Sequence, residues 1–284
     1  MRQLTDRHRV LAFWGKTPHD EATGSTAKPV LHHLIDVAAA ALRLQESSPS
    51  RLSREAAVMG VSGARLLTTS AWLAGLHDLG KFSVSFQAKV ETLWPAAILG
   101  VFPGPQSDRG HWRNTAIILR ATDPERELHA LFPELDDGLE IIAASVAGHH
   151  GRPPALDEYL FNRNNFACEE QVTGPCLEAA LEAMRVLRDL VQPEPLPEIT
   201  KAEQAQAMSW RLAGLTTVAD WVGSDSKFFT FQDRDMPPGD YWRQALRQAD
   251  MAIAAKGLGL LQASETVGAI VDALHYAATP AGCL

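Results

Sequence analysis

The stretch Trp72-Leu73-Ala74-Gly75-Leu76-His77-Asp78-Leu79-Gly80-Lys81 decides how this chain is interpreted. Its apolar residues fit a helix predicted over residues 70–79, and the helix ends in an adjacent histidine and aspartate. One imidazole and one carboxylate at the same point form a mixed nitrogen and oxygen set that suits a divalent metal ion. Taken alone, the pair is equally compatible with a helix end that carries a surface carboxylate.

The same stretch satisfies G-x-x-x-x-G-K between Gly75 and Lys81, which is the start of a phosphate-binding P-loop. Phe82 follows at the position where that motif requires serine or threonine for magnesium. The preceding residues have the periodicity of a helix, whereas a P-loop follows a strand. We therefore exclude nucleotide binding, and hydrolysis of ATP, by that route.

Two further segments carry residues of the same chemistry as the His-Asp pair. His149 and His150 lie side by side between glycines at the end of a predicted helix, and a turn does not by itself require paired imidazoles. His33 and Asp36 are three residues apart and share a helix face, where the carboxylate would hold the imidazole in one tautomer. His32 points elsewhere and is expected to be a solvated surface residue.

Asp220 lies on an otherwise apolar segment with helical periodicity. A buried carboxylate without a partner is energetically costly, so a cation is expected beside it. A metal ion and a basic side chain in a structural salt bridge are the two alternatives at this point.

Together these segments resemble a known family. His33, His77, Asp78 and Asp220, in this order, look like the signature of the HD superfamily of metal-dependent phosphohydrolases. The narrower resemblance is to the HD nuclease domain of the CRISPR-associated nuclease-helicase of type I interference. It is carried by HHLIDVA (32–38), WLAGLHDLGKFSVSFQ (72–87), GHW (110–112), AGHHGRPP (147–154) and LTTVADWVGSDSKFF (215–229).

The resemblance implies an all-α fold, an HD-domain helical bundle whose metal site is built from several helices. It also implies metal ligands for two divalent ions: His33, His77, Asp78 and Asp220 for the first, and Asp78, His111, His149 and His150 for the second. His111 lies in a segment that reads as a loop.

Asp78 is the expected bridge between the ions, which would clamp a phosphodiester. Manganese, nickel, cobalt, iron and magnesium all suit such ligands. Lys81 is expected either to neutralise the scissile phosphate or to stabilise a helix C-terminus.

Helical periodicity runs through most of the chain, and strand-like alternation is hard to find. Helices are predicted over residues 31–45, 70–79, 115–131, 139–147, 176–191, 201–222, 241–256 and 264–276. Residues 1–256 are expected to form an HD-type nuclease domain. Residues 257–284 are expected to form a helical extension that leads toward a helicase absent from this sequence.

Composition excludes several other classes of protein. The net charge of −8 argues against a protein that coats nucleic acid with a broad basic surface. Three cysteines without CxxC spacing exclude a disulfide framework and a thiolate zinc site. No apolar run is long enough to span a bilayer, and no signal peptide is recognisable, so the chain is expected to be cytoplasmic and not bound to a membrane.

The leading hypothesis is a metal-dependent DNA nuclease that prefers single-stranded DNA. By resemblance, it would act in type I CRISPR interference with a helicase domain or subunit and a CRISPR RNA-guided, Cascade-type surveillance complex. An HD hydrolase of nucleotides or cyclic dinucleotides is the first alternative, and a non-catalytic HD binding module is the second. GHHG and ADWxGSD favour the nuclease over the first alternative, and the complete ligand set favours it over the second.

Overall fold

The computed structural model describes residues 6–17, 27–106, 110–121, 127–135, 138–149, 174–230 and 235–259 of the 284-residue chain. Helices dominate these residues, as predicted, and the all-α fold is confirmed. The helices are α1 (Asp6–Leu11), α2 (Val30–Glu46), α3 (Pro49–Met59), α4 (Gly63–Gly75), the 3₁₀ helices η2 (Leu76–Phe82) and η3 (Glu91–Leu93), α5 (Val84–Gln87), α6 (Ala96–Leu99), α7 (His111–Ala121), α8 (Glu127–Leu131), α9 (Leu139–Ala147), α12 (Pro175–Val191), α13 (Ala202–Gly223) and α14 (Pro238–Ala255).

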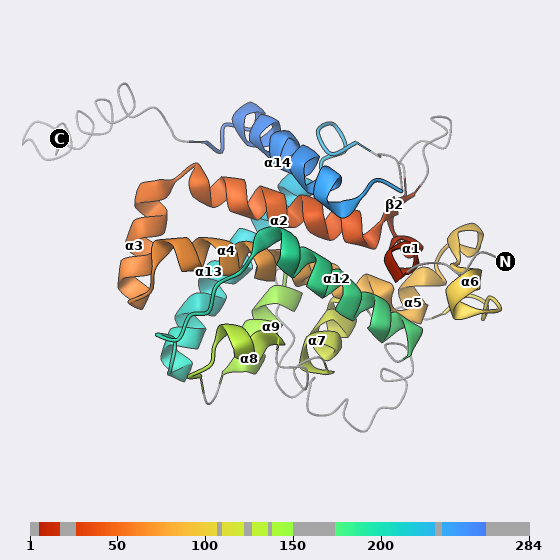
Figure 1. Cartoon of the computed structure of the whole chain (residues 1–284), viewed down its shortest axis with the longest axis horizontal. Helices are drawn as coiled ribbons and strands as arrows, with labels where there is room; N and C mark the ends of the chain where they lie inside the picture. The colour runs from red at the N-terminus through yellow and green to blue at the C-terminus, as the bar shows by residue number, and fades with distance from the viewer. Residues whose placement is uncertain are drawn as a thin grey trace, which may run out of the picture.

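Helix α2 forms the centre of the bundle. Every residue from Val30 to Ala41 is buried, which is typical of a helix enclosed by others on all sides. Helices α4, α12, α13 and α14 pack against it, with α14 on one side and α4 and α12 on the other (Figure 1). Side chains on the first half of α2 therefore point into the interior.

A two-stranded antiparallel ribbon precedes α2. Strand β1 (Trp14–Lys16) pairs with β2 (Lys28–Pro29), with Trp14 opposite Pro29. Sequence periodicity did not predict this ribbon because both strands are too short to show alternation. It places β1 beside the start of α2, since the Val30 amide donates to the Phe13 carbonyl at 2.9 Å.

Most predicted helices are confirmed, and residues 139–147 keep their bounds in α9. The helix predicted over 115–131 is wrong, because α7 begins at His111 and α8 is a separate helix. Pro124 lies between them, and proline cannot donate an amide within a helix. The helix predicted over 70–79 is wrong in its second half, where 3₁₀ helix η2 follows α4. Helix α3 was missed.

The last described helix, α14, ends at Ala255, and residues 260–284 lie outside the described residues, together with the helix predicted over 264–276. The division at residue 256 therefore stays a prediction. Among the helices that the structure describes, none combines the length and apolar character that a membrane span requires.

Candidate metal centre

The His77-Asp78 pair lies where the chain leaves α4 and enters η2. Asp78 has φ −110° and ψ 20°, outside the helical range, and this turns its carboxylate away from the line of α4. Thr115 of α7 fixes the turn, since its hydroxyl donates to the His77 carbonyl and accepts from the Gly80 amide, both at 2.9 Å. Gly80 permits the contact, because an added Cβ would lie 1.8 Å from the His111 carbonyl oxygen. The first turn of α7 is thus held directly against η2.

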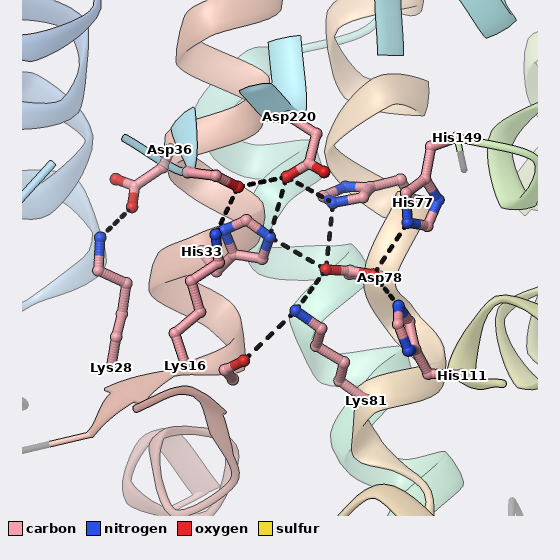
Figure 2. Close-up of polar contacts among 12 residues, drawn as sticks. Lys16, Lys28, His33, Asp36, His77, Asp78, Lys81, His111, His149 and Asp220 are labelled. Carbon is pink, nitrogen blue, oxygen red and sulfur yellow. Dashed lines mark hydrogen bonds and ion pairs between the residues drawn. The ribbon is translucent and has the colours of Figure 1, made fainter. Parts of the chain in front are cut away.

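Asp78 lies between two pairs of imidazoles, one pair at each carboxylate oxygen (Figure 2). Its Oδ2 is 3.0 Å from His33 Nε2 and 3.2 Å from His77 Nε2. Its Oδ1 is 3.0 Å from His111 Nε2 and 3.4 Å from His149 Nε2. Four helical elements, α2, η2, α7 and α9 with the residues that follow it, therefore meet at one carboxylate.

Asp220 of α13 adds a second carboxylate on the side of His33 and His77. Its Oδ1 lies 3.5 Å from His33 Nε2 and 3.6 Å from His77 Nε2. The Ser224 hydroxyl, one turn later on the chain, donates to the same oxygen at 2.6 Å.

Two lysines face these carboxylates. Lys81 Nζ lies 2.7 Å from Asp78 Oδ2 and donates to the Gly15 carbonyl at 3.3 Å, so its ammonium points into the centre. Lys16 of β1 donates to the Ser224 hydroxyl. Both contacts connect the short strand β1 to the centre.

Among the described residues of the centre, the side chains differ in their exposure to solvent. The side chains of His33 and His77 are 0% exposed and that of Asp78 is 3% exposed, whereas Asp220 is 20% and His111 16% exposed. A substrate would therefore approach over Asp220 and His111.

Mutual electrostatics set the protonation of the buried groups. Burial disfavours a charged His77, but Asp78 and Asp220 outweigh it and raise the pKa of His77 to about 9. Burial, together with the charges of Lys16 and Lys81, holds the pKa of His33 well below its usual range. Although burial alone would raise them, the surrounding cations, chiefly His77, lower the pKa values of Asp78 and Asp220, so both are ionised. Burial and Lys81 lower the pKa of Lys16 to about 8.

The donor set fits a divalent cation. His77 Nε2 and Asp78 Oδ1 are buried, and the polar atoms next to them are other candidate ligands, Asp78 Oδ2 at 3.2 Å and His111 Nε2 at 3.0 Å. Ring nitrogens and carboxylate oxygens that face one another in this way can be shared by a cation. Two groups have ligand atoms within 4.8 Å of one another: His33 with His77 and Asp220, and His77 with Asp78 and His149. Imidazole nitrogens combined with carboxylate oxygens suit divalent transition metals.

The structure brings together six of the seven predicted ligands and Lys81 (Figure 2). The seventh, His150, lies outside the described residues. His111 is the first residue of α7 and not a loop residue, which corrects the sequence interpretation.

Two expectations about α2 were wrong. Asp36 does not hold His33, because its Oδ2 accepts from Lys28 at 2.6 Å and from Tyr241 at 3.2 Å. His32 is buried and not solvated, since its ring stacks on Tyr241 at a centroid distance of 3.8 Å. Tyr241, which contacts both residues, comes from α14, which sequence spacing does not connect with α2.

Sequence analysis also missed Lys16 and Ser224. The spacing of Asp220 and Ser224, four residues apart on a helix, was the available signal for the serine. Nothing in the local sequence pointed to Lys16.

Comparison with known proteins identifies the family. The model of the Cas3 HD domain matches residues 14–229, which is most of the chain. This chain belongs to the Cas3 HD-domain family. The match spans β1, the whole of the centre and the loop after α13.

Relatives of this Cas3 HD domain agree with the match. The CRISPR-associated endonuclease/helicase Cas3 of Thermus thermophilus is 32% identical over 251 residues, covering 87% of this chain and 26% of that protein. The Thermus thermophilus Cas3 HD domain, crystallised in the presence of Ni²⁺, superposes with a TM-score of 0.62 at 26% identity, covering 88% of this chain and 91% of that one. A crystal structure of a CRISPR-associated protein gives a TM-score of 0.70 at 25% identity, covering 90% and 28%.

The chain therefore spans about a quarter of the length of the curated Cas3 protein that it matches, and nearly all of the solved HD domain. The match to a complete HD domain confirms the all-α HD fold.

Proposed function

We propose that this chain is a metal-dependent nuclease that hydrolyses phosphodiester bonds, with a preference for single-stranded DNA, in type I CRISPR interference. The observation that carries the proposal is the position of Asp78. Each of its oxygens faces a different pair of imidazoles, so one carboxylate can serve two neighbouring cations.

Two ions would share these ligands: His33, His77, Asp78 and Asp220 on one side, and Asp78, His111, His149 and, from its sequence position alone, His150 on the other. When bound, a pair of divalent ions supplies an activated water and stabilises charge on the leaving oxygen. Nickel, manganese, cobalt, iron and magnesium remain the candidates, and the Ni²⁺ used with the Thermus HD domain makes nickel a practical probe.

The chain's own residues hold and neutralise the phosphodiester. Lys81 already lies 2.7 Å from Asp78 Oδ2. Once cations share the Asp78 carboxylate, the ammonium is available to a phosphate oxygen at the same place, which is the role we assign to Lys81. Asp220 and His111 are more exposed than the buried His77, so the strand would reach the site at these two residues.

An exposed aromatic residue supports a single-stranded substrate. Trp221 directly follows Asp220 and is 69% exposed, which is unusual for tryptophan. Unpaired bases can stack on such a ring, whereas the bases of a duplex are stacked on one another.

We further propose that the chain works with a helicase domain or subunit and with a CRISPR RNA-guided, Cascade-type surveillance complex. The Thermus relative is both endonuclease and helicase, and the region similar to this chain is only 26% of it. The net charge of −8 is consistent with a domain to which DNA is delivered.

The test is cleavage of circular single-stranded DNA by the purified chain with Mn²⁺, Ni²⁺ or Co²⁺, beside the same circle as a duplex. We expect the single-stranded circle to be cut faster and EDTA to abolish the reaction. Asp78→Asn should be inactive. Asp240→Asn is the matched control, because Asp240 is an exposed aspartate that pairs with Arg243 on α14, outside the centre.

Two results would contradict the proposal. Hydrolysis of nucleotides or cyclic dinucleotides with intact DNA would establish the phosphohydrolase alternative. Metal binding without hydrolysis of either substrate would favour the non-catalytic module.

A further inference from the structure

Strand β1 lies outside the helices that supply the ligands, yet both lysines of the centre depend on it. Lys16 is its last residue, and the Gly15 carbonyl accepts from Lys81. The ammonium of Lys16 donates to the Ser224 hydroxyl. Lys16 and Asp220 lie on the same side of Asp78 as His33 (Figure 2). A single hydroxyl group thus separates the Lys16 ammonium from the candidate ligand Asp220.

The hydrogen bonds from Lys16 to Asp220 can run in one direction only. An ammonium group donates and cannot accept, so the Ser224 oxygen accepts from Lys16. The hydroxyl has a single hydrogen, and with Lys16 on the oxygen this hydrogen is directed to Asp220 Oδ1 at 2.6 Å. Without Lys16, the hydroxyl could rotate toward another acceptor.

The last acceptor in this series of hydrogen bonds is the Asp220 oxygen that faces the imidazoles. Asp220 Oδ1 is the atom that lies 3.5 Å from His33 Nε2 and 3.6 Å from His77 Nε2. With 20% of its side chain exposed, Asp220 is the less enclosed of the two carboxylates. Packing therefore restricts the rotation of the Asp220 carboxylate less than that of Asp78, and a hydrogen bond has a larger effect on its orientation.

The position of Lys16 is itself fixed by backbone contacts. The Gln87 side-chain amide accepts from the Trp14 amide at 3.2 Å and donates to the Trp14 carbonyl at 2.9 Å and to the Lys81 carbonyl at 2.7 Å. Gly15 lies so close to α2 that an added Cβ would be 2.9 Å from Val30 Cα. Strand β1 is thus held against both η2 and α2, the elements that carry His77 and His33.

We propose that Lys16 is a positioning residue, which acts through Ser224 to keep Asp220 Oδ1 directed between His33 and His77 for metal binding. This inference rests on the proposed function in so far as it requires a metal at these ligands. Partners of metal ligands commonly change metal affinity by about 10- to 100-fold when they are removed.

The sign of the effect separates positioning from simple electrostatics. Lys16 carries a positive charge near the cation site, so if charge alone mattered, removing it would tighten metal binding. If Lys16 positions Asp220, removing it weakens metal binding.

The experiment is calorimetric titration of the full chain with Ni²⁺, for the wild type, Lys16→Met, Ser224→Ala and the double variant. We expect each single variant to bind about tenfold more weakly. The double variant should be no weaker than the weaker single variant, because both changes break the same chain of hydrogen bonds. Ser224→Thr, which keeps the hydroxyl, should restore most of the affinity.

Lys256→Met is the matched control, since it removes a lysine from a carboxylate pair outside the centre and should leave the Ni²⁺ affinity unchanged. Ser224→Ala removes only one oxygen atom, so it keeps the test valid if Lys16→Met does not fold.

Unchanged or tighter binding by Ser224→Ala or by a folded Lys16→Met would overturn the inference, as would additive losses in the double variant. Unchanged Ni²⁺ affinity with a raised KM for DNA would show that Lys16 contacts the substrate instead. If the wild type binds no Ni²⁺, the proposed function fails as well, whereas wild-type binding with unaffected variants refutes the positioning role alone.

Discussion

Two parts of α13 carry buried charged side chains, and they differ in how completely these side chains are hydrogen-bonded. Near its middle, Arg211 donates to Glu55 at 2.7 Å, to Ser70 at 2.6 Å and to Gln45 at 2.5 Å, so each of its three nitrogens has an acceptor. At its C-terminal end, Asp220 joins a second carboxylate and four imidazoles, and some of the buried atoms there lack hydrogen bonds. Both sites are buried and polar.

The difference shows which buried polar clusters indicate function. The Arg211 cluster is complete in itself, and its arrangement is explained by the stability that it gives to α2, α3, α4 and α13. The Asp78 and Asp220 cluster is incomplete, because the ion pairs that raise the pKa of His77 still leave buried atoms such as His33 Nδ1 without a hydrogen bond. A cation would complete it.

The sharpest test of this comparison is Asp78→Asn, for which we expect the largest effect. The change keeps the size of the side chain and removes the charge that both sets of imidazoles face. Loss of several kcal/mol of metal-assisted stabilisation corresponds to a fall of about 1,000-fold in the rate of DNA cleavage. Single-turnover rates at saturating Mn²⁺ measure it, and a variant that retains a tenth of the wild-type rate would refute the assigned role.

The reciprocal variant is Arg211→Met, which should affect stability and not metal binding. It removes one of the two arginines that pair with Glu55 and the donor to Gln45. Because Glu55 keeps Arg51 at 2.7 Å, we expect a loss of about 2 kcal/mol. Urea denaturation measures this loss, and Ni²⁺ titration should give a dissociation constant within about twofold of the wild type at this distance. A large loss of Ni²⁺ affinity would show that the two parts of α13 are coupled.

Metal binding should depend on pH over a range set by His77. Its pKa is raised to about 9, and a ligand nitrogen must be deprotonated, so binding at neutral pH expels a proton. Below pH 9, Ni²⁺ affinity should fall about tenfold for each pH unit. Calorimetry in buffers of different ionisation enthalpy counts the protons released. An affinity that is constant between pH 7 and 9 would contradict this assignment.

The smallest expected effect is on the stability of the metal-free chain. The protonated His77 stabilises the fold fully below its unfolded pKa of about 6.5, and this contribution is lost as pH rises toward 9. His33 has a lowered pKa, so its contribution is lost as pH falls below about 6.5.

Thermal unfolding in EDTA should therefore show a maximum near pH 6.5, with a change of about 3 °C for each kcal/mol lost on either side. Saturating Ni²⁺ should flatten the alkaline limb, because bound His77 is already neutral. A midpoint that keeps rising from pH 6.5 to 9 in EDTA would oppose the raised pKa of His77.

Much of the fold could be predicted because its helices have clear apolar periodicity, as α9 and α12 show. The ligands could be proposed because a His-Asp pair, paired histidines and an isolated aspartate occur together in one chain, although each of them alone has another interpretation. The resemblance then ordered them into one site, although the residues 33 and 220 are far apart in sequence.

What could not be predicted depends on partners distant in the chain. Asp36 was assigned to His33 on spacing, yet it pairs with Lys28, in the strand before α2, and accepts from Tyr241, 205 residues away. His32 was placed on the surface because the Tyr241 ring that covers it gives no local signal. The role of β1 was invisible for the same reason, since three residues are too few to show a periodicity.

The backbone contact at Gly80 fixes the distance between η2 and α7, which carry His77 and His111. Because the His111 carbonyl lies where a Cβ would be, η2 and α7 meet through a contact of peptide groups, in addition to the hydrogen bonds of the Thr115 hydroxyl. Side-chain packing can adjust by rotamer changes, but peptide dimensions cannot. The separation between His77 and His111 across Asp78 is thus set by the dimensions of the backbone, and substitutions elsewhere in the core that leave this contact intact should not change that separation.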